Sequence, residues 1–280
     1  MKKIISTVLL LIAAFGFSSC ELDSYLFNPE KLNEYRLPGN NIPDSLLKQV
    51  TFNSEGNTLY GYWIASNGKR PGITMLYYHG NKHNIDEYWD RVMLLHQLGI
   101  NVFIFDFRGF GKSQGESSTE SALYADSRAA LDFLKTRKDF NADSLCIYGY
   151  SLGNVGSVYI TAEIFKPLCL FAESPFASAN SLTQGSLVLD IPSKWLTAAE
   201  FDNVKEIKKI STPLMLFHGA SDDFVRYRDN GRLVYEAAPE PKELVLVDNA
   251  VHTDVPYKMG TDNYLNKLRS WIDFSIKNRK

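Results

Sequence analysis

One stretch decides the fold of this chain: Leu145-Cys146-Ile147-Tyr148-Gly149-Tyr150-Ser151-Leu152-Gly153. Its first four residues are apolar or aromatic, as in a strand that is covered on both faces. The last five have the pattern Gly-x-Ser-x-Gly, and the predicted helix that they open contains the small residues Gly156 and Ser157. A sharp strand-to-helix turn needs such small neighbours and presents its serine outward. Ser151 is therefore a candidate nucleophile, and a serine that only closes a tight turn is the alternative.

Short apolar runs on both sides of this stretch alternate with helical patterns. The predicted strands are 50–53, 59–65, 73–78, 102–107, 145–148, 168–172, 214–217 and 244–247. Asn84 with Glu87, and Ser117 with Glu120, are capping pairs that predict helix starts, and a last helix is expected from about residue 263. The first two strands flank a hairpin turn at residues 54–57. The alternation predicts an α/β fold with a mostly parallel, doubly wound sheet and an antiparallel N-terminal hairpin.

A nucleophilic serine needs a base and an acid that orients the base. Asp222 and His252 each follow the end of a predicted strand, at 214–217 and 244–247. We expect His252 to take the Ser151 proton and Asp222 to orient the imidazole. Asp223 is adjacent to Asp222, and Glu173 ends the predicted strand 168–172, so both stay open as alternative acids.

The backbone N–H groups of Asn81 and Leu152 are the candidates for stabilising an oxyanion. Asn81 follows the predicted strand 73–78, and Leu152 follows the candidate nucleophile. Nearby, His79 is interpreted as structural, and the loop 107–113 is expected to line the site. No His, Cys and Asp cluster has metal-ligand spacing, so neither a metal nor another cofactor is expected.

The composition excludes several classes of protein. The chain has 280 residues, of which 22% are charged and 45% hydrophobic, and these values fit one globular domain rather than a disordered or polytopic membrane protein. Lys and Arg number 30 against 32 Asp and Glu, so no basic field indicates nucleic acid. Three cysteines do not make a disulfide framework. Cys146 and Cys169 fall in predicted strands and are expected to be buried free thiols, with a cross-strand disulfide as the alternative.

Residues 1–19 are predicted to be a signal peptide. Lys2 and Lys3 precede an apolar run over 4–17 that is too short to stay as a membrane span, and the run leads to Cys20. Small residues before a cysteine resemble a bacterial lipobox, which implies cleavage before Cys20 and its acylation. A secretory signal with an incidental cysteine is the alternative. Residues 20–44 are predicted to be a tether and 45–280 the folded domain.

Several segments resemble, in order, the small serine hydrolases of the α/β-hydrolase superfamily, the group that includes serine aminopeptidase-like proteins and acyl-protein thioesterases. The segments are 77–84, 106–115, 149–153, 173–176, 213–222 and His252. The resemblance covers roughly residues 45 to 276 and implies the α/β-hydrolase fold with a Ser-His-Asp triad. Because members of the group include esterases, thioesterases, lipases and peptidases, the resemblance does not choose a substrate.

A small predicted lid, at about residues 175–203, bears on the substrate. Its acids are Asp190, Glu200 and Asp202, whereas dedicated peptidases of this group often have a larger cap with acids that hold the substrate's amine. We therefore expect hydrolysis of carboxylic esters or thioesters through an acyl-enzyme, ahead of aminopeptidase or amidase activity. A non-catalytic binding lipoprotein is the third reading.

The expected partners are a small-molecule or lipid-like acyl substrate and the membrane, the latter through the lipid anchor only. No nucleic acid is expected. The lipobox-like segment predicts the bacterial cell envelope as the protein's location. Glu21, rather than Asp, follows Cys20 and favours an outer-membrane anchor.

Overall fold

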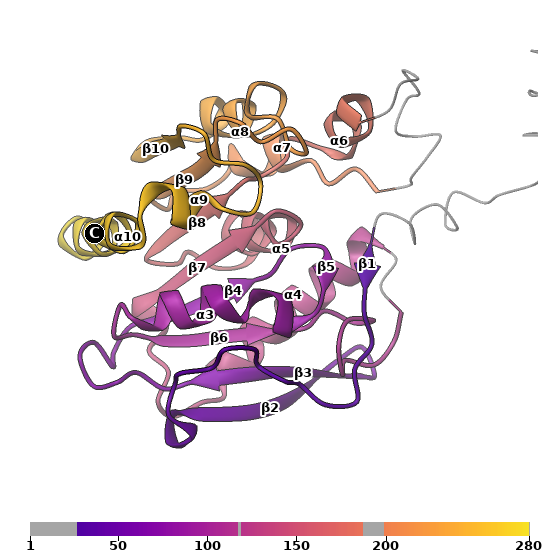
Figure 1. Cartoon of the computed structure of the whole chain (residues 1–280), viewed down its shortest axis with the longest axis vertical. Helices are drawn as coiled ribbons and strands as arrows, with labels where there is room; N and C mark the ends of the chain where they lie inside the picture. Colours follow the sequence, from indigo (N-terminus) through magenta and orange to yellow (C-terminus); the bar gives the residue numbers. More distant parts are fainter. Residues whose placement is uncertain (1–26, 117–118, 187–198, 280) are drawn as a thin grey trace, which may run out of the picture.

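A central sheet with helices on both faces makes up the fold (Figure 1). The computed structural model describes residues 27–116, 119–186 and 199–279. The strands of the sheet are β2 (Leu47–Ser54), β3 (Asn57–Ile64), β4 (Thr74–Tyr78), β6 (Asn101–Phe105), β7 (Leu145–Tyr150), β8 (Cys169–Glu173), β9 (Leu214–Gly219) and β10 (Lys242–Val247). Their order is β10-β9-β8-β7-β4-β6-β3-β2. β3 is antiparallel to both β2 and β6, and the other neighbours are parallel, so the predicted mixed sheet is confirmed.

The N-terminal hairpin turns through two residues, Glu55 and Gly56. Their φ angles are 48° and 85°, as a type I′ hairpin turn requires at both central positions. The Asn53 side chain accepts a hydrogen bond from the Gly56 N–H at 3.1 Å and holds the turn closed. The predicted hairpin is therefore present at the predicted place.

Successive residues of the inner strands point to opposite faces, and helices cover both faces. Leu76 and Ile147 belong to the core under α4 (Glu120–Lys135), α5 (Gly153–Tyr159), α7 (Asn203–Ile207) and α8 (Gly231–Ala237). Met75 and Tyr148 belong to the core under α3 (Trp89–His96), α9 (Val255–Met259) and α10 (Thr261–Lys277). Burial on both faces explains why these strands are almost continuously apolar.

Shorter elements complete the described part of the chain. They are β1 (Asn28–Pro29), β5 (Lys82–His83), α6 (Ala179–Ser186), the 3-10 turns at Asp44–Leu46, Ile85–Tyr88, Ala142–Ser144 and Tyr227–Asp229, and a π-helical turn at Ile160–Ile164. No helix within the described ranges is both long and apolar enough to cross a membrane. Cys146 and Cys169 lie opposite each other in β7 and β8 as buried free thiols, which confirms that prediction.

The two predicted helix caps have different outcomes. The Asn84 side chain accepts from the Asp86 N–H at 3.0 Å and caps the turn that leads into α3, as expected. The Ser117 cap of α4 is wrong, because Glu120 is the first residue of that helix rather than its third. Thr119 supplies the cap instead, accepting from the Ala122 N–H at 3.1 Å, and Ser117 lies outside the described residues.

Residues 27–43 pack against the domain, so the prediction of a tether over 20–44 is wrong for this part. Phe27 and Ile42 are buried, and β1 pairs with β5. The Tyr35 hydroxyl donates to Asp106 Oδ2 at 2.6 Å, and Lys31 Nζ donates to a loop carbonyl at 2.7 Å. Burial of two large apolar side chains, about 1.5–3 kcal/mol each, explains why this segment stays on the domain. The predicted signal peptide, Cys20 and residues 187–198 of the predicted lid lie outside the described residues.

Candidate active site

Ser151 sits on a strained turn between β7 and α5. Its φ is +50°, a conformation that residues other than glycine rarely adopt. Two glycines make the turn possible: a Cβ on Gly149 would lie 2.2 Å from the Ser157 Oγ, and one on Gly153 would lie 2.0 Å from the Tyr78 carbonyl oxygen. The packing thus explains the small residues on either side of the serine.

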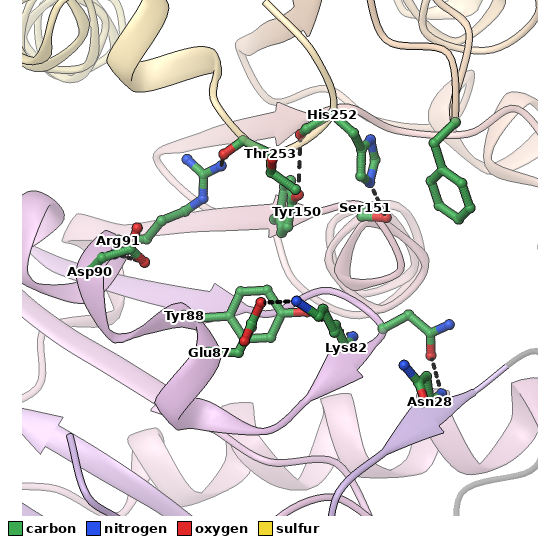
Figure 2. A pocket seen from close by; sticks show the side chains of 12 residues that line it. Asn28, Lys82, Glu87, Tyr88, Asp90, Arg91, Tyr150, Ser151, His252 and Thr253 are labelled. Carbon is green, nitrogen blue, oxygen red and sulfur yellow. Dashed lines mark hydrogen bonds and ion pairs between the residues drawn. The ribbon is translucent and has the colours of Figure 1, made fainter. Parts of the chain in front are cut away.

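Three predicted residues, which follow β7, β9 and β10, meet at the carboxyl end of the sheet. The Ser151 Oγ lies 3.0 Å from His252 Nε2, and His252 Nδ1 lies 2.7 Å from Asp222 Oδ2. Figure 2 shows the His252 ring pointing toward Ser151. The other carboxylate oxygen of Asp222 accepts the backbone N–H groups of Phe224, at 3.1 Å, and of Val225, at 2.7 Å. This bonding fixes the carboxylate, which in turn fixes the imidazole.

The two alternative acids lie elsewhere. The Asp223 side chain is exposed. Glu173 is fully buried, its Oε1 lies 2.8 Å from Arg91 Nη2, and its Oε2 accepts from the Tyr148 hydroxyl. Burial raises the pKa of the Glu173 carboxyl above its ordinary value, while the positive charge of Arg91 opposes the rise. Of the three candidates, Asp222 is the one hydrogen-bonded to His252.

Two residues that the sequence reasoning missed hold the loop that carries His252. The Tyr150 hydroxyl donates to the His252 carbonyl oxygen at 3.1 Å, and Arg91 Nη2 donates to the Thr253 carbonyl oxygen at 3.0 Å (Figure 2). The Arg91 guanidinium also lies 4.7 Å from the centre of the Tyr150 ring. Burial raises the pKa of Tyr150, so its hydroxyl stays a neutral donor. A buried arginine on an otherwise apolar face of α3 was the available signal for Arg91.

The two predicted oxyanion donors lie on different elements. Leu152 directly follows Ser151 at the start of α5. Asn81 lies in the loop after β4 and lines the pocket. The Asn28 N–H donates to the Asn81 side chain at 2.9 Å and approaches the Asn81 carbonyl oxygen at 3.3 Å. Asn28 therefore holds the Asn81 loop, a role that no motif in the sequence indicated.

The pocket next to Ser151 has a volume of about 330 Å³. Its lining residues are Asn28, Asn81, Lys82, Glu87, Tyr88, Asp90, Arg91, Tyr150, Ser151, Phe224, His252 and Thr253. Its charged groups are paired with one another or with neighbours: Lys82 Nζ lies 2.5 Å from Glu87 Oε1, and Asp90 accepts from the Tyr257 hydroxyl. Across the described ranges, no three His, Cys, Asp or Glu side chains gather into a group that could hold a metal ion.

The loop 107–113 is not part of this lining, so that prediction is wrong. Its Arg108 turns toward α4, where the guanidinium lies 2.7 Å from Asp126 Oδ1. Phe107 and Phe110 pack edge-on against the His79 ring, with centres 5.1 and 5.4 Å away. The His79 ring is fully buried and its Nδ1 donates to the Gly80 carbonyl oxygen at 2.7 Å, as a structural histidine would.

Comparison with known proteins agrees with this architecture. A family model described as serine aminopeptidase, S33, matches residues 69–170. The uncharacterized protein YfhR of Escherichia coli K12 is 29% identical over 262 residues, which cover 89% of each chain. The human alpha/beta hydrolase domain-containing protein 17B is 29% identical over 233 residues, 82% of this chain and 76% of that protein. An esterase of Pyrococcus furiosus superposes with a TM-score of 0.71 at 22% identity, covering 89% of this chain and 97% of that one. The chain therefore has the α/β-hydrolase fold.

Proposed function

We propose that this protein is a serine hydrolase that cleaves carboxylic esters or thioesters. The observation that carries the proposal is the chain of two hydrogen bonds, 3.0 Å from Ser151 to His252 and 2.7 Å from His252 to Asp222, at the edge of a pocket. A buried, doubly anchored carboxylate behind the imidazole is the arrangement that activates a serine.

In the proposed reaction, the Ser151 Oγ attacks the acyl carbon while its proton passes to His252 Nε2. The Asp222 carboxylate stabilises the imidazolium that forms. Negative charge develops on the carbonyl oxygen, and the N–H groups of Leu152 and Asn81 are the proposed donors to it.

The tetrahedral intermediate then collapses to an acyl-enzyme. The alcohol or thiol leaves with the proton held by His252, and a water molecule, deprotonated by the same nitrogen, attacks the acyl carbon. Collapse of the second intermediate releases the acid and returns the proton to the Ser151 Oγ. The two half-reactions together consume one water and one ester.

Aminopeptidase activity is the second candidate, and Glu87 and Asp90 favour it because both acids line the pocket. A substrate ammonium would have to compete with the groups that already pair with them. Glu87 is paired with Lys82 and lies 3.4 Å from His83, and Asp90 is bonded to Tyr257. We therefore rank ester and thioester cleavage first.

A fluorophosphonate probe and a substrate panel test the proposal. The probe should label the wild type and the Ser221→Ala variant, which changes an exposed serine close to Asp222, but not Ser151→Ala. The panel should contain short-chain esters, thioesters and aminoacyl amides. If the probe does not label the wild type, the protein is a non-catalytic binding protein rather than a hydrolase. If aminoacyl amides are cleaved faster than esters and thioesters, aminopeptidase activity ranks first.

We further propose that the chain is a bacterial envelope lipoprotein, acylated at Cys20. The support is the sequence: two lysines, an apolar run and small residues directly before a cysteine. The outer membrane is the proposed site because Glu21 follows the cysteine. Mass analysis of the mature N-terminus tests this, and an unmodified N-terminus would refute it.

A further inference from the structure

Phe27 and Asn28 fasten the N-terminal segment to the domain beside the Ser151 pocket. Phe27 is 4% exposed and packs edge-on against Phe201, with ring centres 6.2 Å apart. The next residue, Asn28, is bonded to Asn81 and lines the same pocket as Ser151. Whatever is attached upstream of Phe27 is therefore attached beside the pocket.

Only a short connection separates this point from the proposed lipid anchor. From Cys20 to Phe27 the chain takes seven residue steps, which in any conformation span at most about 25 Å. A domain of about 250 residues is roughly 45 Å across. Because the reach is smaller than the diameter, an anchor at Cys20 excludes orientations in which the far side of the domain rests on the membrane.

The rim of the pocket is apolar on the side of the His252 loop. Seven large hydrophobic side chains are exposed among the described residues, and three of them lie on the loops after β9 and β10 or on α9: Phe224 (61%), Val251 (40%) and Tyr257 (46%). Phe224 lines the pocket and lies 5.1 Å from the His252 ring. The other four, Leu233, Leu246, Phe274 and Ile276, lie on α8, β10 and α10.

The rim also carries charged groups, Lys82, Glu87 and Asp90, and Asp90 accepts a hydrogen bond from the Tyr257 hydroxyl, so charged and apolar side chains meet there. A rim with both apolar and charged side chains suits the boundary between lipid headgroups and acyl chains. Such a surface can rest at the headgroup level without burying its carboxylates in hydrocarbon, which would be costly.

We propose that the Cys20 anchor holds the mouth of the Ser151 pocket on the membrane surface, with Phe224, Val251 and Tyr257 at the lipid, so that the substrate is an acyl ester or thioester drawn from that membrane. This inference rests on the proposed hydrolase activity and on the proposed lipidation. It deepens both, because it makes the lipid surface the source of the substrate.

Polarity-sensitive labels test the orientation without any activity. The full chain, produced with its lipid, is reconstituted in vesicles of phosphatidylethanolamine and phosphatidylglycerol. Val251→Cys carries an NBD label at the rim, and Ile276→Cys carries the same label on α10, where the native side chain is exposed to a similar extent, 48% against 40%. Cys146 and Cys169 are buried. The label at 251 should brighten several-fold on reconstitution and the label at 276 should not change.

A longer connection tests the geometric step. An insertion of about thirty Gly and Ser residues after Asp23 extends the reach to more than about 100 Å, well beyond the diameter of the domain. The label at 251 should then lose most of its increase. Hydrolysis of a long-chain ester embedded in the vesicles should slow several-fold, while hydrolysis of a water-soluble short-chain ester should not change.

Equal responses at 251 and 276, an unlipidated Cys20, or a long-linker variant with unchanged label and unchanged vesicle hydrolysis would each overturn the inference. Failure of the proposed function has a different signature. In that case neither ester is hydrolysed and the fluorophosphonate does not label Ser151, while the label at 251 still reports contact with lipid.

Discussion

Replacing Asp222 by asparagine is the sharpest test of the site, because the structure fixes what the new amide must do. The carboxylate Oδ1 accepts two backbone N–H groups, from Phe224 and Val225. After Asp222→Asn, the amide oxygen must keep that place, since the amide nitrogen cannot accept from these donors. The NH₂ group then takes the place of Asp222 Oδ2, which lies 2.7 Å from His252 Nδ1, and points at that nitrogen.

An NH₂ donor at this position changes the tautomer of His252. Nδ1 must accept, so the imidazole proton moves to Nε2, the nitrogen that lies 3.0 Å from the Ser151 Oγ. A protonated Nε2 cannot take the serine proton. A change of tautomer of this kind lowers turnover by about 10⁴-fold, which corresponds to about 5 kcal/mol of activation free energy. Both backbone hydrogen bonds survive, so the free energy of unfolding should fall by only about 1 kcal/mol.

The assay compares three variants by turnover of a short-chain p-nitrophenyl ester per folded molecule, with folding followed by urea denaturation. Asp223→Asn changes the exposed neighbour and should leave both quantities close to wild type. Glu173→Gln leaves Arg91 buried without its counter-charge and should lose about 3–5 kcal/mol of unfolding free energy, with a smaller effect on turnover. If Glu173→Gln stops turnover and Asp222→Asn keeps more than about a tenth of it, the assignment of the acid is wrong.

Three further predictions concern the turn, the triad and a buried histidine. Ser151→Ala and His252→Ala should each lower single-turnover hydrolysis by several orders of magnitude, and the double variant should lose little more, since the groups act as a unit; losses that multiply would contradict this. Gly153→Ala should lower the free energy of unfolding in urea by about 1–3 kcal/mol or more, because its Cβ meets the Tyr78 carbonyl oxygen; a wild-type midpoint would contradict the close packing. Burial lowers the pKa of His218, so the unfolded chain takes up that proton first as the pH falls below about 6.5. Unfolding free energy should therefore decrease from pH 7 to 5, and His218→Gln should flatten this slope; an equal slope would refute the contribution.

The parts of the fold that could be predicted are those with a local signal. A parallel strand that is buried on both faces is apolar along most of its length, and residues 73–78, apart from Thr74, and 145–148 show this directly. Ser151, Asp222 and His252 each come just after a short apolar run that predicts a strand, so the topology of the sheet brings them to one edge without further information. The choice of Asp222 over Asp223 depends on the structure, in which Asp222 is hydrogen-bonded to His252 and Asp223 is exposed.

The parts that could not be predicted depend on contacts between distant residues. Prolines and polar residues between 28 and 43 indicated a tether, yet Phe27 packs on Phe201 and Tyr35 bonds Asp106. Both partners, Phe201 and Asp106, lie far from this segment in the sequence. No periodic pattern marks Phe27 and Ile42, the two buried apolar residues that fasten the segment to the domain. Arg108 likewise turns away from the pocket and pairs with Asp126 on α4. No local sequence pattern indicates that this helix lies close to the Arg108 loop.

The buried ion pair of Arg91 and Glu173 links the turn that carries Ser151 to the loop that carries His252. Burying two charges is expensive, and well-packed apolar residues would often be as stable, so the pair needs another explanation than stability. The Glu173 carbonyl oxygen accepts the Ser151 N–H at 3.0 Å and the Asn154 side chain at 2.9 Å, which fixes the strained turn. Its carboxylate holds Arg91, and Arg91 holds the carbonyl of Thr253, next to His252. One residue at the end of β8 thus sets the position of the serine turn and the histidine loop together. An apolar pair could fill the same space, but it could not set the distance between these two loops.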